Sequence, residues 1–184
     1  VGPGLGDKHT TRTFIENIIP SIKIPTVMDA DGLRHLSQIN DWHKKLFAPT
    51  VLTPHPGEMS ILTGLSKEEI QSNRQEVAGR YAKEWGHVVV LKGAFTVIAS
   101  PDGRMTIIPV ATPALARAGT GDVLAGLIVG LRAQGLDAYD AAVAGAFIHA
   151  QAGLLAAETL GTTASVLASD VLDAVAHVIT ELEQ

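Results

Sequence analysis

The spacing of apolar residues along the chain follows two periods, one typical of helices and one typical of buried strands. Residues 10–22 carry apolar side chains every three or four positions, which predicts a helix with one apolar face. The same spacing continues through residues 66–85, where Ser66 and Glu69 match a capping box, so one long helix is predicted there. Further helices are expected over residues 32–37, 59–63, 120–134, 138–160 and 168–182.

Short apolar runs between these helices predict strands. Residues 25–28, 50–53 and 87–91 are such runs, and the last is uniformly apolar, as expected of a strand covered on both faces. Residues 95–99 and 105–110 flank a Pro-Asp-Gly-Arg turn, which predicts a hairpin. Strands that alternate with helices indicate an α/β fold with an open sheet, and we expect one domain over residues 1–184.

Composition narrows the function classes. Hydrophobic residues make up 46% and charged residues 18% of the chain, which excludes intrinsic disorder. A net charge of -5 and an aromatic content of 4% count against nucleic acid as a partner. The absence of cysteine excludes disulfides, thiolate metal sites and a cysteine nucleophile. No run approaches the roughly 20 apolar residues of a membrane span, so we expect a cytoplasmic protein without a membrane partner.

The first residues, Val-Gly-Pro-Gly-Leu-Gly, contain no methionine. A valine that runs directly into a glycine-rich turn is typical of the last residue of a strand. We therefore expect the 184 residues to be the C-terminal part of a longer domain, with its N-terminal portion missing. On this expectation the chain by itself would expose an apolar sheet edge, and it would either associate through that edge or be held by residues outside this sequence.

The segment Ala118–Gly126 (AGTGDVLAG) is the strongest candidate for a catalytic site. Gly119 and Gly121 let the backbone approach a ligand, and the helix that follows presents free N–H groups to an anion. An aspartate at such a place, Asp122, suits a general base that takes a proton from a hydroxyl attacking a phosphate. The alternative is that Thr120 or Asp122 only caps the helix.

Other polar residues follow the predicted strands. Lys92, at a strand end before a glycine turn, suits a nucleotide contact at the carboxyl edge of the sheet, or else is a hairpin lysine in solvent. His55 suits a donor to a ligand, and Glu58 suits Mg²⁺ held through water or a favourable charge in the first helical turn. Asp29 and Asp31 suit Mg²⁺ or substrate, and Asp31 alternatively caps a helix. Five histidines lack metal-ligand spacing and are interpreted as structural or surface residues: His35, His43, His87, His149 and His177.

Five motifs occur in one order along the chain: GPGLG (2–6), DADGL (29–33), TPHPGE (53–58), KGAFT (92–96) and AGTGDVLAG (118–126). Together they resemble the ADP-dependent NAD(P)H-hydrate dehydratase family of the ribokinase-like superfamily. The resemblance implies a three-layer α/β/α sandwich with a mostly parallel sheet and further βα units before residue 1. It also implies a homo-oligomer and, in many bacterial members, fusion to an epimerase for the same damaged cofactor.

The resemblance also implies roles for single residues. Gly4, His55 and Asp122 would contact the hydrated cofactor, and Glu58 would lie near Mg²⁺. The adenine nucleotide would be held by the residues of the KGAFT motif together with one glycine of the helix start: Lys92, Gly93, Ala94, Phe95, Thr96 and Gly121. Many members have Asn-Pro where this chain has Thr112-Pro113, so the amide that they offer is absent here.

The implied activity is dehydration of the S-epimer of hydrated NADH or NADPH back to NADH or NADPH, with ADP as co-substrate and AMP and phosphate as products. Two alternatives stay open. One is a small-molecule kinase of the same superfamily that phosphorylates a vitamin, thiazole or sugar hydroxyl, although TPHPGE and KGAFT favour the dehydratase. The other is a nucleotide-binding fragment without catalytic activity.

Overall fold

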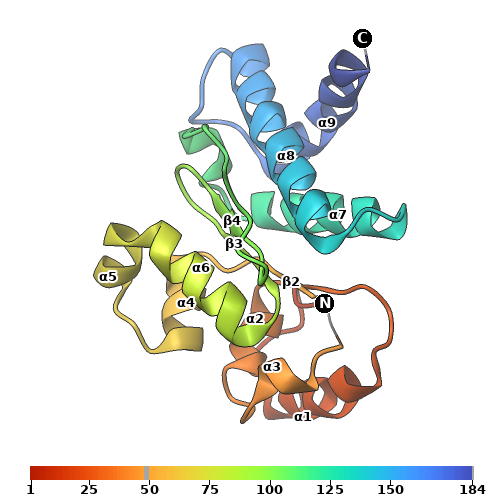
Figure 1. Ribbon diagram of the computed structural model, residues 1–184. Helices are drawn as coiled ribbons and strands as arrows, with labels where there is room; N and C mark the ends of the chain where they lie inside the picture. The colour runs from red at the N-terminus through yellow and green to blue at the C-terminus, as the bar shows by residue number, and fades with distance from the viewer. Residues whose placement is uncertain (48–49, 184) are drawn as a thin grey trace.

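The computed structural model describes residues 1–47 and 50–183, which form a five-stranded sheet between two layers of helices (Figure 1). The strands are β1 (Val27–Met28), β2 (Val51–Leu52), β3 (Val88–Leu91), β4 (Val97–Ala99) and β5 (Met105–Ile107), in that order across the sheet. β1, β2 and β3 pair in parallel, whereas β3, β4 and β5 pair antiparallel. The predicted α/β sheet and its hairpin are therefore confirmed.

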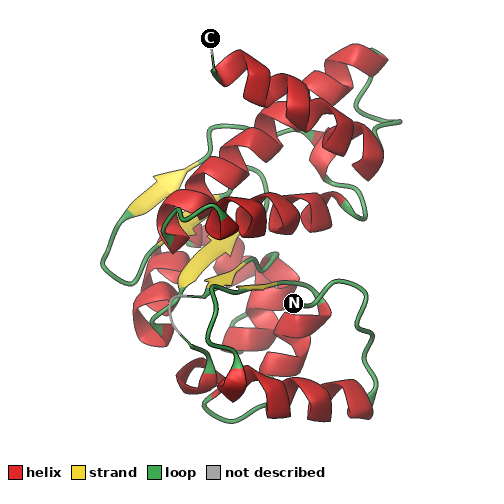
Figure 2. Ribbon diagram, turned by 90° about the vertical axis from the view of Figure 1, so that its right-hand side faces the viewer, coloured by secondary structure: helices red, strands yellow, loops and turns green. Residues whose placement is uncertain are grey.

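Helices cover both faces of the sheet (Figure 2). One face carries α1 (His9–Ile18), α2 (Asp31–Leu36), α3 (Trp42–Lys45), α4 (Pro56–Thr63), α5 (Lys67–Ser72) and α6 (Arg74–Trp85). The other carries α7 (Thr120–Ala133) and α8 (Ala138–Leu160), and α9 (Ala168–Leu182) packs against both. Alternate residues of β3 face opposite layers, because Val89 and Leu91 join the core of the first layer and Val88 and Val90 that of the second.

Some element boundaries differ from the sequence prediction. Residues 66–85 are two helices, α5 and α6, because the backbone leaves the helical region at Asn73 (φ -128°, ψ 37°). The Asn73 amide donates to the carbonyl of Glu69, a local bond that competes with helix continuation. The first helix ends in a 3₁₀ turn, Ile19–Ser21, where Pro20 lacks an N–H donor. α3 and a 3₁₀ turn at Pro113–Leu115 were not predicted.

α8 corrects the expectation about apolar runs, since it is long and apolar enough to cross a membrane by length and composition alone. Just over half of its most apolar stretch is buried, and it packs against α7, α9 and strands β2 to β4. Small residues permit this packing: a Cβ on Gly145 would lie 2.7 Å from Cγ1 of Ile128 in α7. Burial in the core accounts for the apolar character of α8.

The glycine turn at the start of the chain packs against β1 and α2. The backbone of Val1 lies beside β1, because its carbonyl accepts from Asp29 N–H at 3.1 Å and its amino group donates to the Val27 carbonyl at 2.7 Å. A Cβ on Gly2 would lie 1.7 Å from the Asp29 carbonyl oxygen, so only glycine fits there. Asp31 accepts from Gly6 N–H and His35 donates to the Gly6 carbonyl, both at 2.8 Å. Asp31 therefore holds this turn and does not cap α2.

Candidate active site

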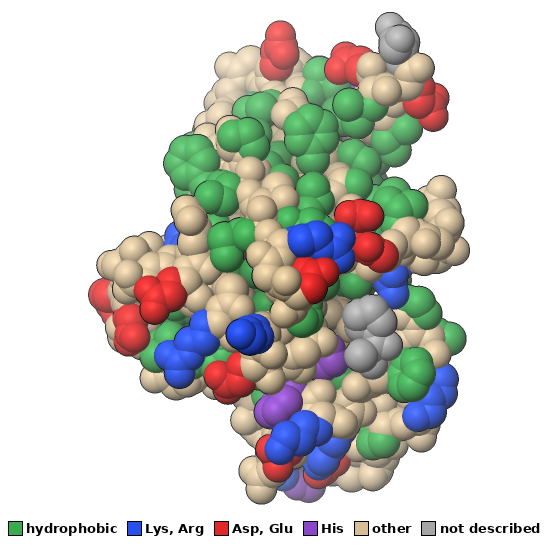
Figure 3. Space-filling view, viewed as in Figure 1, with side chains coloured by type: hydrophobic (Ala, Val, Ile, Leu, Met, Phe, Trp, Pro, Cys, Tyr) green, Lys and Arg blue, Asp and Glu red, His purple; other side chains and the backbone are tan. Residues whose placement is uncertain are grey.

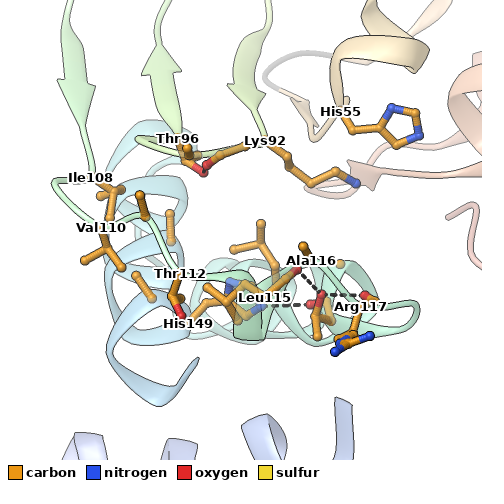
Figure 4. A pocket seen from close by; sticks show the side chains of 18 of the residues that line it. His55, Lys92, Thr96, Ile108, Val110, Thr112, Leu115, Ala116, Arg117 and His149 are labelled. Carbon is orange, nitrogen blue, oxygen red and sulfur yellow. Dashed lines mark hydrogen bonds between the residues drawn. The ribbon is translucent and has the colours of Figure 1, made fainter. Parts of the chain in front are cut away.

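A cavity of about 930 Å³ opens where the carboxyl ends of β1, β2 and β3 meet the N-terminus of α7. Lys92 and Thr96 lie on one wall, and Thr112, Leu115, Arg117 and His149 lie on the opposite wall (Figure 4). The volume is that of a pocket for a nucleotide-sized ligand. The parallel strands and α7 thus bring together four of the five motif segments, and no residue of the fifth, GPGLG (2–6), is in the described lining.

The cavity has an apolar end and a charged end. Ile108 and Val110 lie at the apolar end, whereas the Lys92 ammonium and His55 lie at the other (Figure 4). Asp29 and Glu58 also line the cavity and contact Lys92, which places two further charges at this end. An apolar slot joined to a charged end suits a molecule that combines a flat ring with anionic groups.

Lys92 is the partly buried cation of the charged end. Its side chain is 18% exposed, and Nζ lies 2.7 Å from Oδ1 of Asp29 and 3.7 Å from Oε2 of Glu58. The alternative of a hairpin lysine in solvent is therefore wrong. A Cβ placed on Gly121 would lie 3.4 Å from Lys92 Nζ, so the ammonium also faces the first turn of α7. A cation and free helix N–H groups at one place favour an anion between them.

His55 and Glu58 form the capping box at the start of α4. His55 Nδ1 accepts from Gly57 N–H at 2.9 Å and Glu58 N–H at 3.2 Å, and Glu58 Oε2 accepts from His55 N–H at 2.8 Å. The capping role of Nδ1 leaves the ring proton on Nε2, which lies 3.5 Å from Oε1 of Glu58. Burial lowers the pKa of His55, and Glu58 offsets part of that shift. His55 is therefore neutral near pH 7 and keeps one N–H that can donate.

The first turn of α7 carries Asp122, whose side chain is exposed to the cavity. The N-cap of α7 is Gly119, at φ +88°, and no side chain caps the helix within the described residues. Thr120 Oγ1 instead lies 2.8 Å from the carbonyls of Leu115 and Arg117 and donates toward this loop. The capping alternative for Thr120 and Asp122 is therefore wrong. The Asp122 carboxylate accepts no hydrogen bond from the part of the chain that the structure describes.

Most of the predicted site residues meet in this cavity. Its lining includes eight of them: His55, Glu58, Lys92, Gly93, Ala94, Thr96, Gly121 and Asp122. Gly4 and Phe95 are not among the described residues that line it. Gly4 lies in the exposed turn beside α2, and the Phe95 ring is exposed on a left-handed backbone (φ +56°). A motif in sequence marks the segment but not the direction of each side chain.

His149 is the lining residue that sequence reasoning assigned to structure or surface. It lies in the middle of α8, is 8% exposed, and its Nε2 lies 2.8 Å from the Thr120 carbonyl. Burial lowers its pKa to about 4. Its trace in the sequence is that it is the one polar residue of the stretch 141–150, which is otherwise made of small and apolar residues.

No cluster of three or more His, Asp or Glu side chains that could hold a metal ion occurs among residues 1–47 and 50–183. Asp29 and Glu58 lie close enough to share Lys92, but the ammonium lies between them. The described residues of the cavity therefore do not form a metal site from protein ligands alone. A Mg²⁺ ion fits here only in the way usual for phosphate chemistry, with waters and substrate phosphates as most of its ligands.

Comparison with known proteins agrees with the motifs. The sequence model of the NAD(P)H-hydrate dehydratase family matches residues 1–176. A bifunctional NAD(P)H-hydrate repair enzyme of Moorella thermoacetica is 44% identical over all of this chain, which spans 34% of that enzyme. An ADP-dependent (S)-NAD(P)H-hydrate dehydratase of Xanthomonas campestris is 38% identical over 88% of this chain, a match that spans 54% of the relative.

A solved structure shares the fold. The ADP/ATP-dependent NAD(P)H-hydrate dehydratase of Bacillus subtilis, co-crystallized with ATP and Mg²⁺, superposes with a TM-score of 0.87 at 31% identity. The match covers 98% of this chain and 63% of the Bacillus chain. The three-layer ribokinase-like sandwich is therefore confirmed. The chain spans less than two thirds of the length of these relatives.

Proposed function

The chain belongs to the NAD(P)H-hydrate dehydratase family, and we propose that its cavity dehydrates the S-epimer of hydrated NADH or NADPH at the expense of ADP. The observation that carries this proposal is the free carboxylate of Asp122, which lies at a helix N-terminus in the same cavity as the Lys92 ammonium. A carboxylate at the start of α7 would repel a phosphate group bound there. A role in proton transfer accounts for the presence of Asp122 at this position.

ADP fits the two ends of the cavity. The adenine ring would occupy the apolar end beside Ile108 and Val110, and the phosphates would extend toward Lys92 and the Gly121 N–H. Gly93, Ala94 and Thr96 form the wall between these ends. The Bacillus relative was co-crystallized with ATP and Mg²⁺, which supports a nucleotide in the corresponding cavity here.

The charges of the site support Mg²⁺ as a companion of the nucleotide. Asp29, Glu58 and Asp122 bring three carboxylates to a cavity whose partly buried cation is Lys92. A diphosphate would add further negative charge, which a divalent cation offsets. Glu58 would hold the ion through water, because Oε2 already accepts from His55 N–H. Mg²⁺ bound there would neutralise charge on the transferring phosphoryl group.

The residues then perform a phosphoryl transfer followed by an elimination. Asp122 takes the proton of the hydroxyl on the hydrated nicotinamide ring, and that oxygen forms a bond to the β-phosphorus of ADP while the bond to AMP breaks. The Gly121 N–H and Lys92 stabilise charge on the phosphoryl oxygens. The carbon–oxygen bond of the resulting ester then breaks, phosphate leaves, and loss of a proton from the neighbouring carbon restores the ring double bond.

Asp122→Asn tests this mechanism. Incubating the protein with hydrated NADH, ADP and Mg²⁺ and following absorbance near the NADH band should show turnover. The Asn variant should lose roughly 10²–10⁴-fold in kcat, because a general base is removed, while calorimetry shows ADP affinity nearly unchanged. Asp140→Asn is a matched control, since Asp140 occupies the same third position of α8 outside the described lining of the cavity.

The outcomes separate the alternatives. ADP consumption with a stable phosphorylated product would support a small-molecule kinase, and nucleotide binding without turnover would support a non-catalytic nucleotide-binding chain. An Asn variant that retains most of the activity would show that Asp122 only carries a favourable first-turn charge. Equal losses in Asp122→Asn and Asp140→Asn would indicate a general effect on folding.

We propose that this protein works together with the enzyme that produces its substrate. An epimerase for hydrated NAD(P)H, fused or separate, would supply the S-epimer, and the name of the bifunctional Moorella repair enzyme supports a second repair activity beside the dehydratase. A cytoplasmic location stays a prediction. Assembly into a homo-oligomer stays a prediction. Apolar side chains gather on the face that includes α8 and α9 (Figure 3), and exposed residues of these helices include Leu154, Leu160, Leu172 and Ile179.

A further inference from the structure

The first turn of α7 depends on contacts from other segments for its position. Thr120 lies between two glycines, and Gly119 has φ +88°, a region open to few other residues. Neither glycine has a side chain that could anchor this turn. The Thr120 hydroxyl bonds to the preceding loop, and the Thr120 carbonyl is bonded by His149 of α8 (Figure 4). Gly121 and Asp122 follow directly.

α8 is a rigid support for this contact. It packs against strands β2, β3 and β4, and Gly145 lets it approach Ile128 of α7 closely. His149 lies one helical turn beyond Gly145, on the same side of α8, because residues four apart share a helix face. A hydrogen bond from this position therefore sets the start of α7 relative to the sheet, and with it relative to Lys92 at the end of β3.

We infer that His149 is a positioning residue for phosphoryl transfer: its Nε2–H bond to the Thr120 carbonyl fixes the Gly121 N–H and the Asp122 carboxylate at the cavity that Lys92 also lines. The inference rests on the proposed function and adds His149 to the residues that support it. His149 itself takes no proton from the substrate. Its effect passes through the geometry of the first turn of α7.

The ring is suited to this role because it is neutral. A carbonyl oxygen only accepts, so the proton must be on Nε2 and the bond fixes one tautomer. Burial lowers the pKa of His149 to about 4, and the charge of Lys92 acts in the same direction. Near pH 7 His149 therefore holds the carbonyl without adding a charge beside the carboxylates of the cavity.

A second histidine offers a matched control. His87 is 2% exposed, and its Nε2 lies 3.0 Å from the carbonyl of His43, the same kind of bond on a buried ring. Burial lowers its pKa as well. His87 lies at the other end of β3 from Lys92 and is outside the described lining of the cavity. Its loss should disturb packing without moving the start of α7.

Three variants test the inference: His149→Met removes the donor at similar volume, His149→Gln restores a side-chain N–H, and His87→Met is the control. His149→Met should lower kcat about 10- to 100-fold, in line with the cost of displacing a catalytic group by about 1 Å. ADP affinity should fall less than kcat, because Lys92 still contacts the phosphates, and His149→Gln should recover most of kcat. His87→Met should lower Tm without lowering kcat.

A readout without catalysis keeps the inference separate from the proposed function. Nitrogen-15 relaxation should give order parameters near 0.85 for Gly121 and Asp122 in the parent protein and in His87→Met, and values below about 0.6 in His149→Met. If the parent shows no dehydration, the proposed function fails and this measurement alone decides the positioning role. Rigid values in His149→Met, or a loss of kcat that only parallels the loss of Tm in both Met variants, would overturn the inference.

Discussion

At the scale of the residue, Lys92 belongs to a partly buried ion pair and is also the cation that would meet ADP. Replacing it with Met removes a charge opposite Asp29 and Glu58 and leaves these buried carboxylates unpaired. We expect ADP affinity to fall at least tenfold, in a salt-sensitive manner, and stability to fall by about 3–5 kcal/mol. Calorimetry with ADP and urea unfolding measure the two effects.

The double variant Lys92→Met with Asp29→Asn separates these effects. The amide that replaces the carboxylate would carry no charge, so much of the lost stability should return while ADP affinity stays low. Affinity for the hydrated cofactor should change little in either variant. Equal ADP affinity in the parent protein and Lys92→Met would contradict a phosphate contact and leave Lys92 with a structural role alone.

At the scale of the element, the turn after β3 is shaped by α6. Gly93 has φ +148°, and a Cβ there would lie 3.0 Å from Nη1 of Arg74, whose Nη2 donates to the Leu91 carbonyl at 2.8 Å. Gly93→Ala should therefore strain the turn, cost about 1–3 kcal/mol of stability and weaken ADP binding. Gly103→Ala is the control, because Gly103 has φ +94° but open space around it. A comparable loss of ADP affinity in both variants would contradict this account.

At the scale of the whole molecule, buried histidines make stability depend on pH. The pKa of His149 is lowered to about 4, whereas an unfolded histidine binds a proton near pH 6.5. Between these values the unfolded state binds more protons, so the free energy of unfolding should fall as the pH drops from about 6.5 toward 4. The contribution of His149 is up to roughly 3 kcal/mol.

Urea unfolding at pH 7.5, 6 and 5 checks this expectation. The parent protein should lose stability steadily over the series, and His149→Met should lose less of it, because one of the two buried histidines with a lowered pKa is gone. Parallel pH profiles for the two proteins would show that His149 does not titrate in the way its burial indicates.

Local patterns along the chain were enough to predict several features of the fold. Apolar periodicity located the strands and the three long C-terminal helices, and the Pro-Asp-Gly-Arg turn located the hairpin of β4 and β5. Because the carboxyl ends of parallel strands lie at one edge of a sheet, the residues after β1, β2 and β3 could be expected to meet. Asp29, His55 and Lys92 do so.

Contacts between residues far apart in the chain could not be predicted from local patterns, because they arise only when the elements pack. Lys92 meets Asp29 across 63 positions and His149 meets Thr120 across 29, and neither pairing leaves a local spacing that could predict it. The direction of a side chain could not be predicted from its motif either. Phe95 belongs to the KGAFT motif, yet it is outside the described lining of the cavity. Local periodicity fixes which face of an element is apolar. The angle at which packed elements cross then fixes which polar side chains meet.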